Sequence, residues 1–199
     1  MILISVVIPA YNEERNIGQC LAALKKQDFP SKNYEIIVVD NNSTDKTAQI
    51  ARKMRAKVVF EKTQGYVFAL RRGCSQAKGE IIAITDADTL VSKDWLKKIY
   101  QAYQKNPQVV CLGGRAIYKP KVPLAVLMEL LFALGGWILK LFPGFNLSIK
   151  RDVYQKIGGF REEVNFDTDV DLCLRARREG KMLFLWNNPV VTSSRRFRS

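Results

Sequence analysis

Short apolar runs rich in β-branched residues recur along this chain, and each one ends at a proline, an acid or a turn. These runs are Ile4–Ile8, Glu35–Asp40, Val58–Phe60, Ile81–Thr85 and Val109–Tyr118. Continuous apolar runs of this length are typical of strands that are buried on both faces. Because segments with helix signals separate them, the sequence predicts an α/β fold with a mostly parallel central sheet flanked by helices.

The segments between these runs have apolar residues at helical spacing or residues that cap helices. No linker and no internal repeat interrupts the 199 residues, so a single domain is predicted. The predicted helices begin near Asn12, run from the turn at 41–45 to Met54, cover Tyr66–Ala77, and extend from Ser92 to about Asn106.

The composition excludes several kinds of site. The chain has no histidine, which removes the commonest general base and every zinc site built on histidine. The cysteines form no metal-binding pair and are predicted to be buried reduced thiols, which favours a cytoplasmic location. The start of the chain lacks a basic leader, so a signal peptide is not expected. The cysteines are Cys20, Cys74, Cys111 and Cys173.

The net charge of +13 suits an anionic partner such as nucleic acid, acidic lipid or a phosphorylated substrate. A nucleic-acid-binding module is expected to interleave aromatic and basic residues on one sheet face. The predicted strands are apolar instead, so nucleic acid is not a predicted partner, although such a module remains an alternative. Part of the basic excess is concentrated at 195–198, and a solvated basic end is the simplest interpretation of it.

Two carboxylates one residue apart, Asp86 and Asp88, follow the predicted strand Ile81–Thr85. An open α/β sheet binds its ligands outside the carboxyl ends of its strands. Carboxylate oxygens at that edge suit a hard divalent cation that also holds substrate phosphates. The pair therefore favours metal-assisted chemistry on a nucleotide or sugar phosphate, with a solvated turn as the alternative.

The apolar segment 122–141 interrupts the alternation. It carries Glu129 near its centre and lysines on both flanks, which disfavours a membrane span. Three interpretations remain open: a helix that is buried or that contacts another subunit, as in a homodimer; a helix that lies in a membrane interface as a peripheral contact; and a span.

Four patches of the chain occur in an order that resembles the family 2 glycosyltransferases. They are 5–14 (SVVIPAYNEE), 36–45 (IIVVDNNSTD), 77–80 leading into 86–88 (DAD), and 169–175 (DVDLCLR). The resemblance implies the GT-A fold over 1–199, with a nucleotide-sugar-binding half at 1–118 and an acceptor and catalytic half at 119–199. It also implies inverting transfer of a sugar from a nucleotide-diphosphate donor to a hydroxyl of a glycan or lipid-linked acceptor, with Mn²⁺ or Mg²⁺ as cofactor.

The resemblance also assigns residues that bind the donor. Asp88 is the predicted direct ligand of the metal, and Asp86 is predicted to complete the metal's shell or to contact ribose. A strand stop, a helix cap and an Asx turn are the plainer interpretations of several of the other positions. The remaining predicted donor-binding residues are Pro9, Ala10, Tyr11, Glu13, Asp40, Arg71, Ala87, Asn146, Arg195 and Arg196.

The resemblance makes Asp169 the predicted base, at the start of a helix whose dipole favours the ionised carboxylate. The family's acid pair has Thr168 in its first place, a departure that Asp167 could offset. A plainer interpretation is that these acids only cap the helix, in which Asp171 can pair with Arg175.

The family's later histidine is also absent, and water, Ser193 or Ser194 would have to replace it. A catalytically degenerate relative of the family therefore remains an alternative, as does a nucleotidyltransferase, although Tyr11–Glu14 is unlike the phosphate loop expected of one. The apolar segment and the basic charge favour a lipid-linked acceptor and a location at the inner face of the cell membrane.

Overall fold

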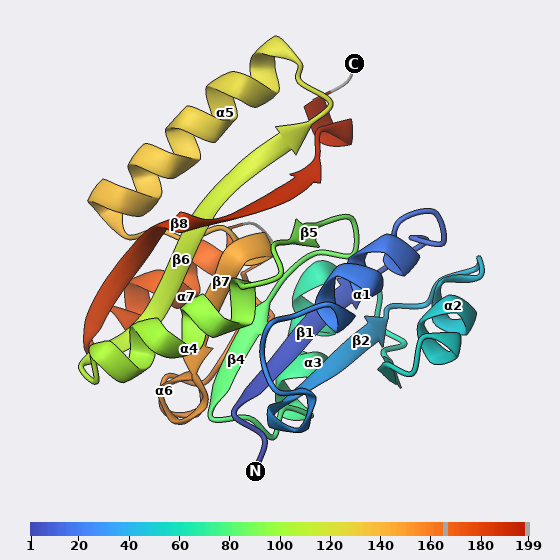
Figure 1. The fold of residues 1–199 in the computed structure, drawn as a ribbon, viewed down its shortest axis with the longest axis horizontal. Helices are drawn as coiled ribbons and strands as arrows, with labels where there is room; N and C mark the ends of the chain where they lie inside the picture. The colour runs from blue at the N-terminus through green and yellow to red at the C-terminus, as the bar shows by residue number, and fades with distance from the viewer. Residues whose placement is uncertain (165–166, 198–199) are drawn as a thin grey trace.

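The computed structural model describes residues 1–164 and 167–197. Within them the chain builds one eight-stranded sheet, in the order β3-β2-β1-β4-β7-β6-β8-β5 (Figure 1). The strands are β1 (Ile4–Ala10), β2 (Tyr34–Asp40), β3 (Lys57–Phe60), β4 (Ile81–Ile84), β5 (Leu90–Val91), β6 (Val109–Lys119), β7 (Leu147–Lys150) and β8 (Lys181–Ser193).

Seven α-helices and four shorter helical turns connect the strands in the described residues. The α-helices are α1 (Ile17–Lys25), α2 (Thr47–Lys53), α3 (Tyr66–Ser75), α4 (Trp95–Lys105), α5 (Pro123–Leu134), α6 (Arg151–Lys156) and α7 (Thr168–Ala176). The shorter turns are η1 (Ser31–Asn33), the π-helical η2 (Gly135–Leu139), η3 (Gly144–Asn146) and η4 (Arg195–Phe197).

The predicted α/β class is confirmed, but the sheet is mixed. Strands β3, β2, β1 and β4 are parallel, as the apolar runs predicted. Beyond β4 the direction changes, because β7 runs antiparallel to both β4 and β6. Strand β8 then pairs parallel with β6 and antiparallel with β5.

Alternate residues of the parallel strands face two separate hydrophobic clusters. Val6 and Ile8 of β1 face the cluster formed with α1, α2 and α4, whereas Val7 faces the cluster formed with α3, α6 and α7. All three of these side chains are fully buried. Burial on both faces, with side chains alternating across the strand, explains why these strands are apolar at every position.

The loop after β1 differs from its prediction. We expected a helix from about Asn12, but Asn12 has a φ of 52°, and α1 begins at Ile17. The loop is instead tied to the turn before α2: the Glu13 amide donates to Thr47 Oγ1 (2.7 Å), and Asn12 Oδ1 accepts from the Thr44 amide (2.8 Å). These contacts fix Glu13 beside the end of β1, where it is 8% exposed.

Pro9 does not end β1, although it was expected to stop the strand. Strand β4 pairs with β1 only as far as Val7. Beyond that point β2 is the one strand beside β1 in the described residues. A residue that lacks an N–H is tolerated where a strand has an open side.

The patch at 77–80 has a structural explanation. The amides of Lys78 and Gly79 both donate to Ser5 Oγ, at 3.0 and 2.8 Å. A Cβ at Gly79 would lie 2.6 Å from the Ser5 backbone nitrogen, so only glycine allows this approach. The contact sets the start of β4 against β1 and thereby positions the residues that follow β4.

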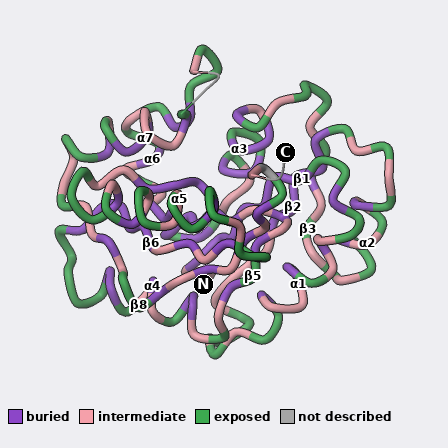
Figure 2. Tube along the Cα trace, turned by 90° about the horizontal axis from the view of Figure 1, so that it is seen from above, coloured by how far each residue is buried: buried purple, intermediate pink, exposed green. Residues whose placement is uncertain are grey.

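Helix α5 packs against β6, at the end of the molecule far from the N-terminus (Figure 1). Its one acid, Glu129, faces inward, where it accepts from the Tyr118 amide and pairs with Lys121 (2.6 Å). The outer face of α5 and η2 is apolar and exposed, with Trp137 51% and Ile138 62% exposed. Exposed stretches along α5 can be followed in Figure 2. In the described part of the chain, no helix is both long enough and apolar enough to cross a membrane.

Candidate active site

Two adjoining cavities, of about 620 and about 310 Å³, open where β1 and β4 end. Tyr66, Asp86 and Asp88 line both of them. Cavities of this size suit small-molecule ligands. The larger one extends toward the start of α7, and the smaller one toward the end of β1.

The smaller cavity gathers most of the predicted donor-binding residues. It lies between the loop that follows β1, the start of α3 and the Asp86–Asp88 loop. Segments that are distant in sequence therefore form one surface. The predicted residues that line this cavity are Pro9, Ala10, Tyr11, Glu13, Asp86, Ala87, Asp88 and Arg195.

Arg195 joins the two acidic positions of this cavity. Its Nη1 donates to Glu13 Oε2 (3.0 Å), and its Nη2 contacts both Glu13 Oε1 and Asp88 Oδ2, the latter at 3.1 Å. The hydrogen bond with Glu13 raises the pKa of Arg195 above its ordinary value, and the charge of Asp88 adds to that rise. The guanidinium therefore stays charged and neutralises part of the acidic cluster.

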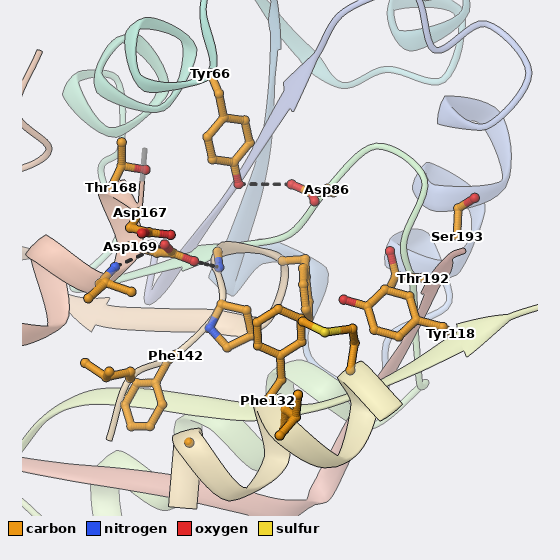
Figure 3. Close-up of a pocket in the computed structure, with 18 of the residues that line it drawn as sticks. Tyr66, Asp86, Tyr118, Phe132, Phe142, Asp167, Thr168, Asp169, Thr192 and Ser193 are labelled. Atoms are coloured by element: carbon orange, nitrogen blue, oxygen red, sulfur yellow. Dashed lines mark hydrogen bonds between the residues drawn. The ribbon is translucent and has the colours of Figure 1, made fainter. Parts of the chain in front are cut away.

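The two acids after β4 are held by hydroxyl groups. Tyr66 Oη donates to Asp86 Oδ1 at 3.1 Å (Figure 3). Thr192 Oγ1 lies 3.4 Å from Asp88 Oδ1 and also accepts from Thr89 Oγ1 (2.9 Å). These carboxylates and hydroxyl groups would all offer oxygen atoms as metal ligands, which suits Mg²⁺ or Mn²⁺ better than a soft metal.

Metal-binding side chains are sparse around this pair. No three His, Cys, Asp or Glu side chains of the described residues converge in a way that could hold a metal ion. A cation at Asp86 and Asp88 would therefore need further oxygen ligands from a substrate or from water. This donor set fits a metal that binds together with a phosphorylated ligand.

Asp169 lies in the larger cavity, at the first turn of α7. Its Oδ2 accepts from the Gly144 amide (2.8 Å), and its Oδ1 accepts from the Val170 amide (3.0 Å) (Figure 3). Burial raises the pKa of the Asp169 carboxyl above its ordinary value, and the charge of Asp167 adds to the rise. The backbone amides of Gly144, Asp169 and Val170 lower the pKa, yet burial outweighs them.

Much of the rest of the larger cavity's lining is apolar. Met128, Leu131 and Phe132 of α5 line the larger cavity together with Phe142 and Phe145. Leu131 is also half exposed, so the apolar outer face of α5 is continuous with this lining. A ligand at Asp169 would meet both carboxylates and hydrocarbon.

Three predicted donor-binding residues lie outside both of these cavities. Asp40 is buried and accepts from the Ser43 amide (3.3 Å), in agreement with the plainer turn interpretation. Arg71 pairs with Glu162 (3.0 Å) and donates to the Phe160 carbonyl (3.3 Å). Asn146 is the third. The side chain of Arg196 lies outside the described part of the structure.

Asn146 has its amide group committed to the scaffold. Its Oδ1 accepts from Trp95 Nε1 (3.0 Å), and its Nδ2 donates to the carbonyls of Arg115 (3.0 Å) and Asn188 (2.9 Å). These partners belong to α4, β6 and β8, and Asn146 is 3% exposed. The side chain therefore joins three elements beneath the larger cavity.

Sequence reasoning missed Tyr66, which separates the two cavities. A Cβ at Gly144 would lie 2.6 Å from Tyr66 Oη, so the loop before β7 approaches the tyrosine closely. The position of Tyr66 directly after Gly65, at the start of a helix behind a strand, was an available signal. The predicted pair of Asp171 with Arg175 is confirmed at 3.0 Å.

The mixed sheet with its two cavities at the strand ends is the arrangement of the GT-A fold. The chain matches the family named Glycosyl transferase family 2 over residues 5–161. It therefore belongs to that family, as the resemblance of its four patches predicted.

Individual relatives agree with this assignment. The chain is 34% identical over 125 residues to dolichyl N-acetyl-alpha-D-glucosaminyl phosphate 3-beta-D-2,3-diacetamido-2,3-dideoxy-beta-D-glucuronosyltransferase of Methanococcus voltae, covering 57% of this chain and 39% of the relative. It is 28% identical over 204 residues to glycosyltransferase AglE of Haloferax volcanii, and this match covers 90% of this chain and 63% of the relative. The chain therefore spans less than two thirds of the length of these relatives.

A solved structure supports the fold. Mannosyltransferase PcManGT of Pyrobaculum calidifontis, in complex with GDP-Man and Mn²⁺, superposes with a TM-score of 0.78. The two proteins are 27% identical, and the match covers 94% of this chain and 56% of that one.

We predict that Asn146→Ala lowers the free energy of unfolding by about 3 kcal/mol, because it leaves the buried Trp95 indole N–H and the carbonyls of Arg115 and Asn188 without this partner. Chemical denaturation measures the change. Asn187→Ala, at an exposed position of β8, is the matched control and should leave stability within about 0.5 kcal/mol. A stable Asn146→Ala protein that binds nucleotide-sugar poorly would instead give Asn146 the ligand-binding role predicted from the sequence.

Proposed function

We propose that this protein is an inverting glycosyltransferase that moves a sugar from a nucleotide-diphosphate donor to a hydroxyl group of an acceptor. One observation carries the proposal: Asp169 lines the same cavity as Asp86 and Asp88. A candidate base and a candidate phosphate-anchoring site therefore face one volume. Family membership and the PcManGT complex with GDP-Man support the donor class.

The nucleoside of the donor would occupy the smaller cavity. Tyr11 is 46% exposed at the rim and offers a ring for stacking on a base. Glu13 and the backbone of Pro9 and Ala10 offer acceptors for base or ribose donors. The sugar would then extend past Asp86 into the larger cavity, toward Asp169.

Asp88 and Asp86 would hold Mn²⁺ or Mg²⁺, with hydroxyl groups such as those of Thr192 and Ser193 close by. When bound, the cation would neutralise charge on the diphosphate leaving group. The Mn²⁺ in the PcManGT complex supports a divalent ion. Oxygen ligands suit either metal.

Asp169 would act as the base. Its carboxylate takes the proton of the acceptor hydroxyl as that oxygen bonds to the anomeric carbon, while the bond from this carbon to the diphosphate breaks. The Gly144 amide at 2.8 Å orients the carboxylate. Attack from the face opposite the leaving group inverts the anomeric configuration.

We expect a thermal-shift panel of UDP, GDP, CDP and dTDP with Mn²⁺ to identify one preferred nucleotide. Asp88→Ala should lose the metal-dependent shift, because it removes the proposed ligand. Asp169→Asn should keep the shift but lower kcat by about 10²–10⁴-fold, because it removes the base. Absence of any shift in the wild type would refute the donor site, and full activity of Asp169→Asn would refute the base.

The raised pKa of Asp169 predicts the acidic limb of the pH profile. Only the deprotonated carboxylate accepts a proton, so kcat/KM should fall as pH falls through this pKa. Because burial raises it, the limb should lie above the ordinary aspartate value of about 3.9. Donor hydrolysis or transfer measured across pH tests this prediction, and a limb at or below that value would contradict it.

The apolar lining of the larger cavity favours an acceptor that carries a lipid. The Methanococcus voltae relative is named for dolichyl N-acetyl-alpha-D-glucosaminyl phosphate, which supports a lipid-linked glycan as acceptor here. The exposed apolar face of α5 and η2 is flanked by lysines, among them Lys119, Lys121 and Lys140. Apolar side chains beside cations suit peripheral contact with an acidic membrane surface, on the cytoplasmic side of the cell membrane.

We expect the protein to sediment with anionic vesicles at low salt and to do so less at high salt. Ile138→Glu should reduce binding, because it places a charge at the most exposed side chain of the apolar face. Leu174→Glu, at a 49% exposed leucine of α7, is the matched control and should bind as the wild type does. Equal binding of both variants, or no binding by the wild type, would rule out membrane contact through this face.

A further inference from the structure

Arg195 connects three segments that are distant in the sequence. Glu13 lies in the loop after β1, Asp88 in the loop after β4, and Arg195 at the start of η4, directly after β8. Two nitrogens of the guanidinium contact Glu13, and one of them also contacts Asp88 at 3.1 Å. Arg195 is thus the link between the first and last parts of the site.

The guanidinium of Arg195 contacts the Asp88 carboxylate, which is the proposed direct ligand of the metal. Asp88 Oδ2 contacts Arg195, and Asp88 Oδ1 lies 3.4 Å from Thr192 Oγ1. A divalent cation at Asp88 would approach a guanidinium of like charge within a few ångströms. The repulsion between them opposes binding of the cation while Arg195 stays in this position.

The two ends of the link differ in how firmly they are held. Glu13 is buried, and its Oε2 also accepts from Asn16 Nδ2 at 2.7 Å. The side chain of Arg195 is 48% exposed and can move toward a ligand. Release of Asp88 can therefore leave the contact with Glu13 in place.

A diphosphate offers Arg195 a better partner than Asp88. Guanidinium groups bind phosphate oxygens through paired hydrogen bonds. Arg195 lines the smaller cavity, beside both acids, so a diphosphate in the proposed donor site would lie within reach of it. Movement of the guanidinium from Asp88 to the diphosphate would end its contact with the carboxylate, and the phosphate charge would offset its repulsion of the cation.

We propose that Arg195 makes binding of the metal ion and binding of the nucleotide depend on each other. Without a donor, the guanidinium holds Asp88 and excludes the cation. The diphosphate draws it away, and the cation then enters. This role rests on the proposed donor site and assigns Arg195 as a positioning residue that couples two ligands, beyond a simple phosphate contact.

The proposed coupling predicts a change in Mn²⁺ affinity that a simple phosphate contact does not predict. Loss of Arg195 should tighten binding of Mn²⁺ alone, by about tenfold if the coupling has the usual size. The same loss should weaken nucleotide binding. Thermodynamic linkage further requires that the wild type bind Mn²⁺ more tightly with nucleotide than without it.

The test is an electron paramagnetic resonance titration with MnCl₂ alone on the wild type, Arg195→Ala and Arg195→Gln. We expect both variants to bind Mn²⁺ about tenfold more tightly than the wild type. Lys97→Ala removes one positive charge from the exposed pair with Asp28 and serves as the charge-matched control, with unchanged Mn²⁺ affinity. The second substitution at Arg195 keeps the test valid if circular dichroism shows that the alanine variant fails to fold.

Equal or weaker Mn²⁺ binding by the folded Arg195 variants would overturn the proposal. A gain of similar size in Lys97→Ala would also overturn it, since the effect would then be one of net charge. Titration with GDP and UDP separates this outcome from failure of the donor site. If no nucleotide binds to the wild type, the proposed function fails, whereas the comparison with Mn²⁺ alone still tests the contact of Arg195 with Asp88.

Discussion

The change of strand direction between β4 and β7 is the constraint on which the site depends. Strand β4 is parallel to β1 on one side and antiparallel to β7 on the other. The end of β4 therefore lies beside the start of β7, with Ile84 opposite Leu147. The segment after β4 carries Asp86 and Asp88, and the segment before β7 carries Gly144. Because the Gly144 amide holds Asp169, this single reversal brings the base candidate to the cavity of the two acids.

The parallel half of the sheet could be predicted from the sequence because each of its strands is buried on both faces. Residues such as Val6 and Val7 belong to different clusters, so no polar residue interrupts the run. Strand β8 escaped prediction for the opposite reason. Most of β8 is only partly buried, and it contains Asn187, Asn188 and Pro189, which are typical of turns. Pairing with β6, in which partners such as Val109 and Lys181 are far apart in the sequence, makes this segment a strand, and no local pattern reveals that pairing.

The site residues also divide into those whose positions could be predicted from the sequence and those whose positions could not. Positions at strand ends, such as Tyr11 and Asp88, could be placed from the sequence because parallel strands end at a common edge. Asn146 and Arg71 could not, because their roles depend on partners that only the tertiary structure supplies: the indole of Trp95 in one case, and Glu162 in the other. The raised pKa of Asp169 was likewise missed, since burial in a cavity is a property of several elements together.

Strand β8 carries Trp186 beside the exposed apolar face and Thr192 beside Asp88. The two functions that we propose, surface contact and donor binding, therefore share one stretch of backbone. Between these two positions the pairing of β8 with β6 is irregular: Leu185 lies opposite Gly114 and Val190 opposite Ala116, so β8 has extra residues in this interval. A change in length between the apolar face and the acidic site can therefore be absorbed in this irregular stretch, whereas from Val190 onward regular pairing with β6 fixes the face of the sheet on which Thr192 lies.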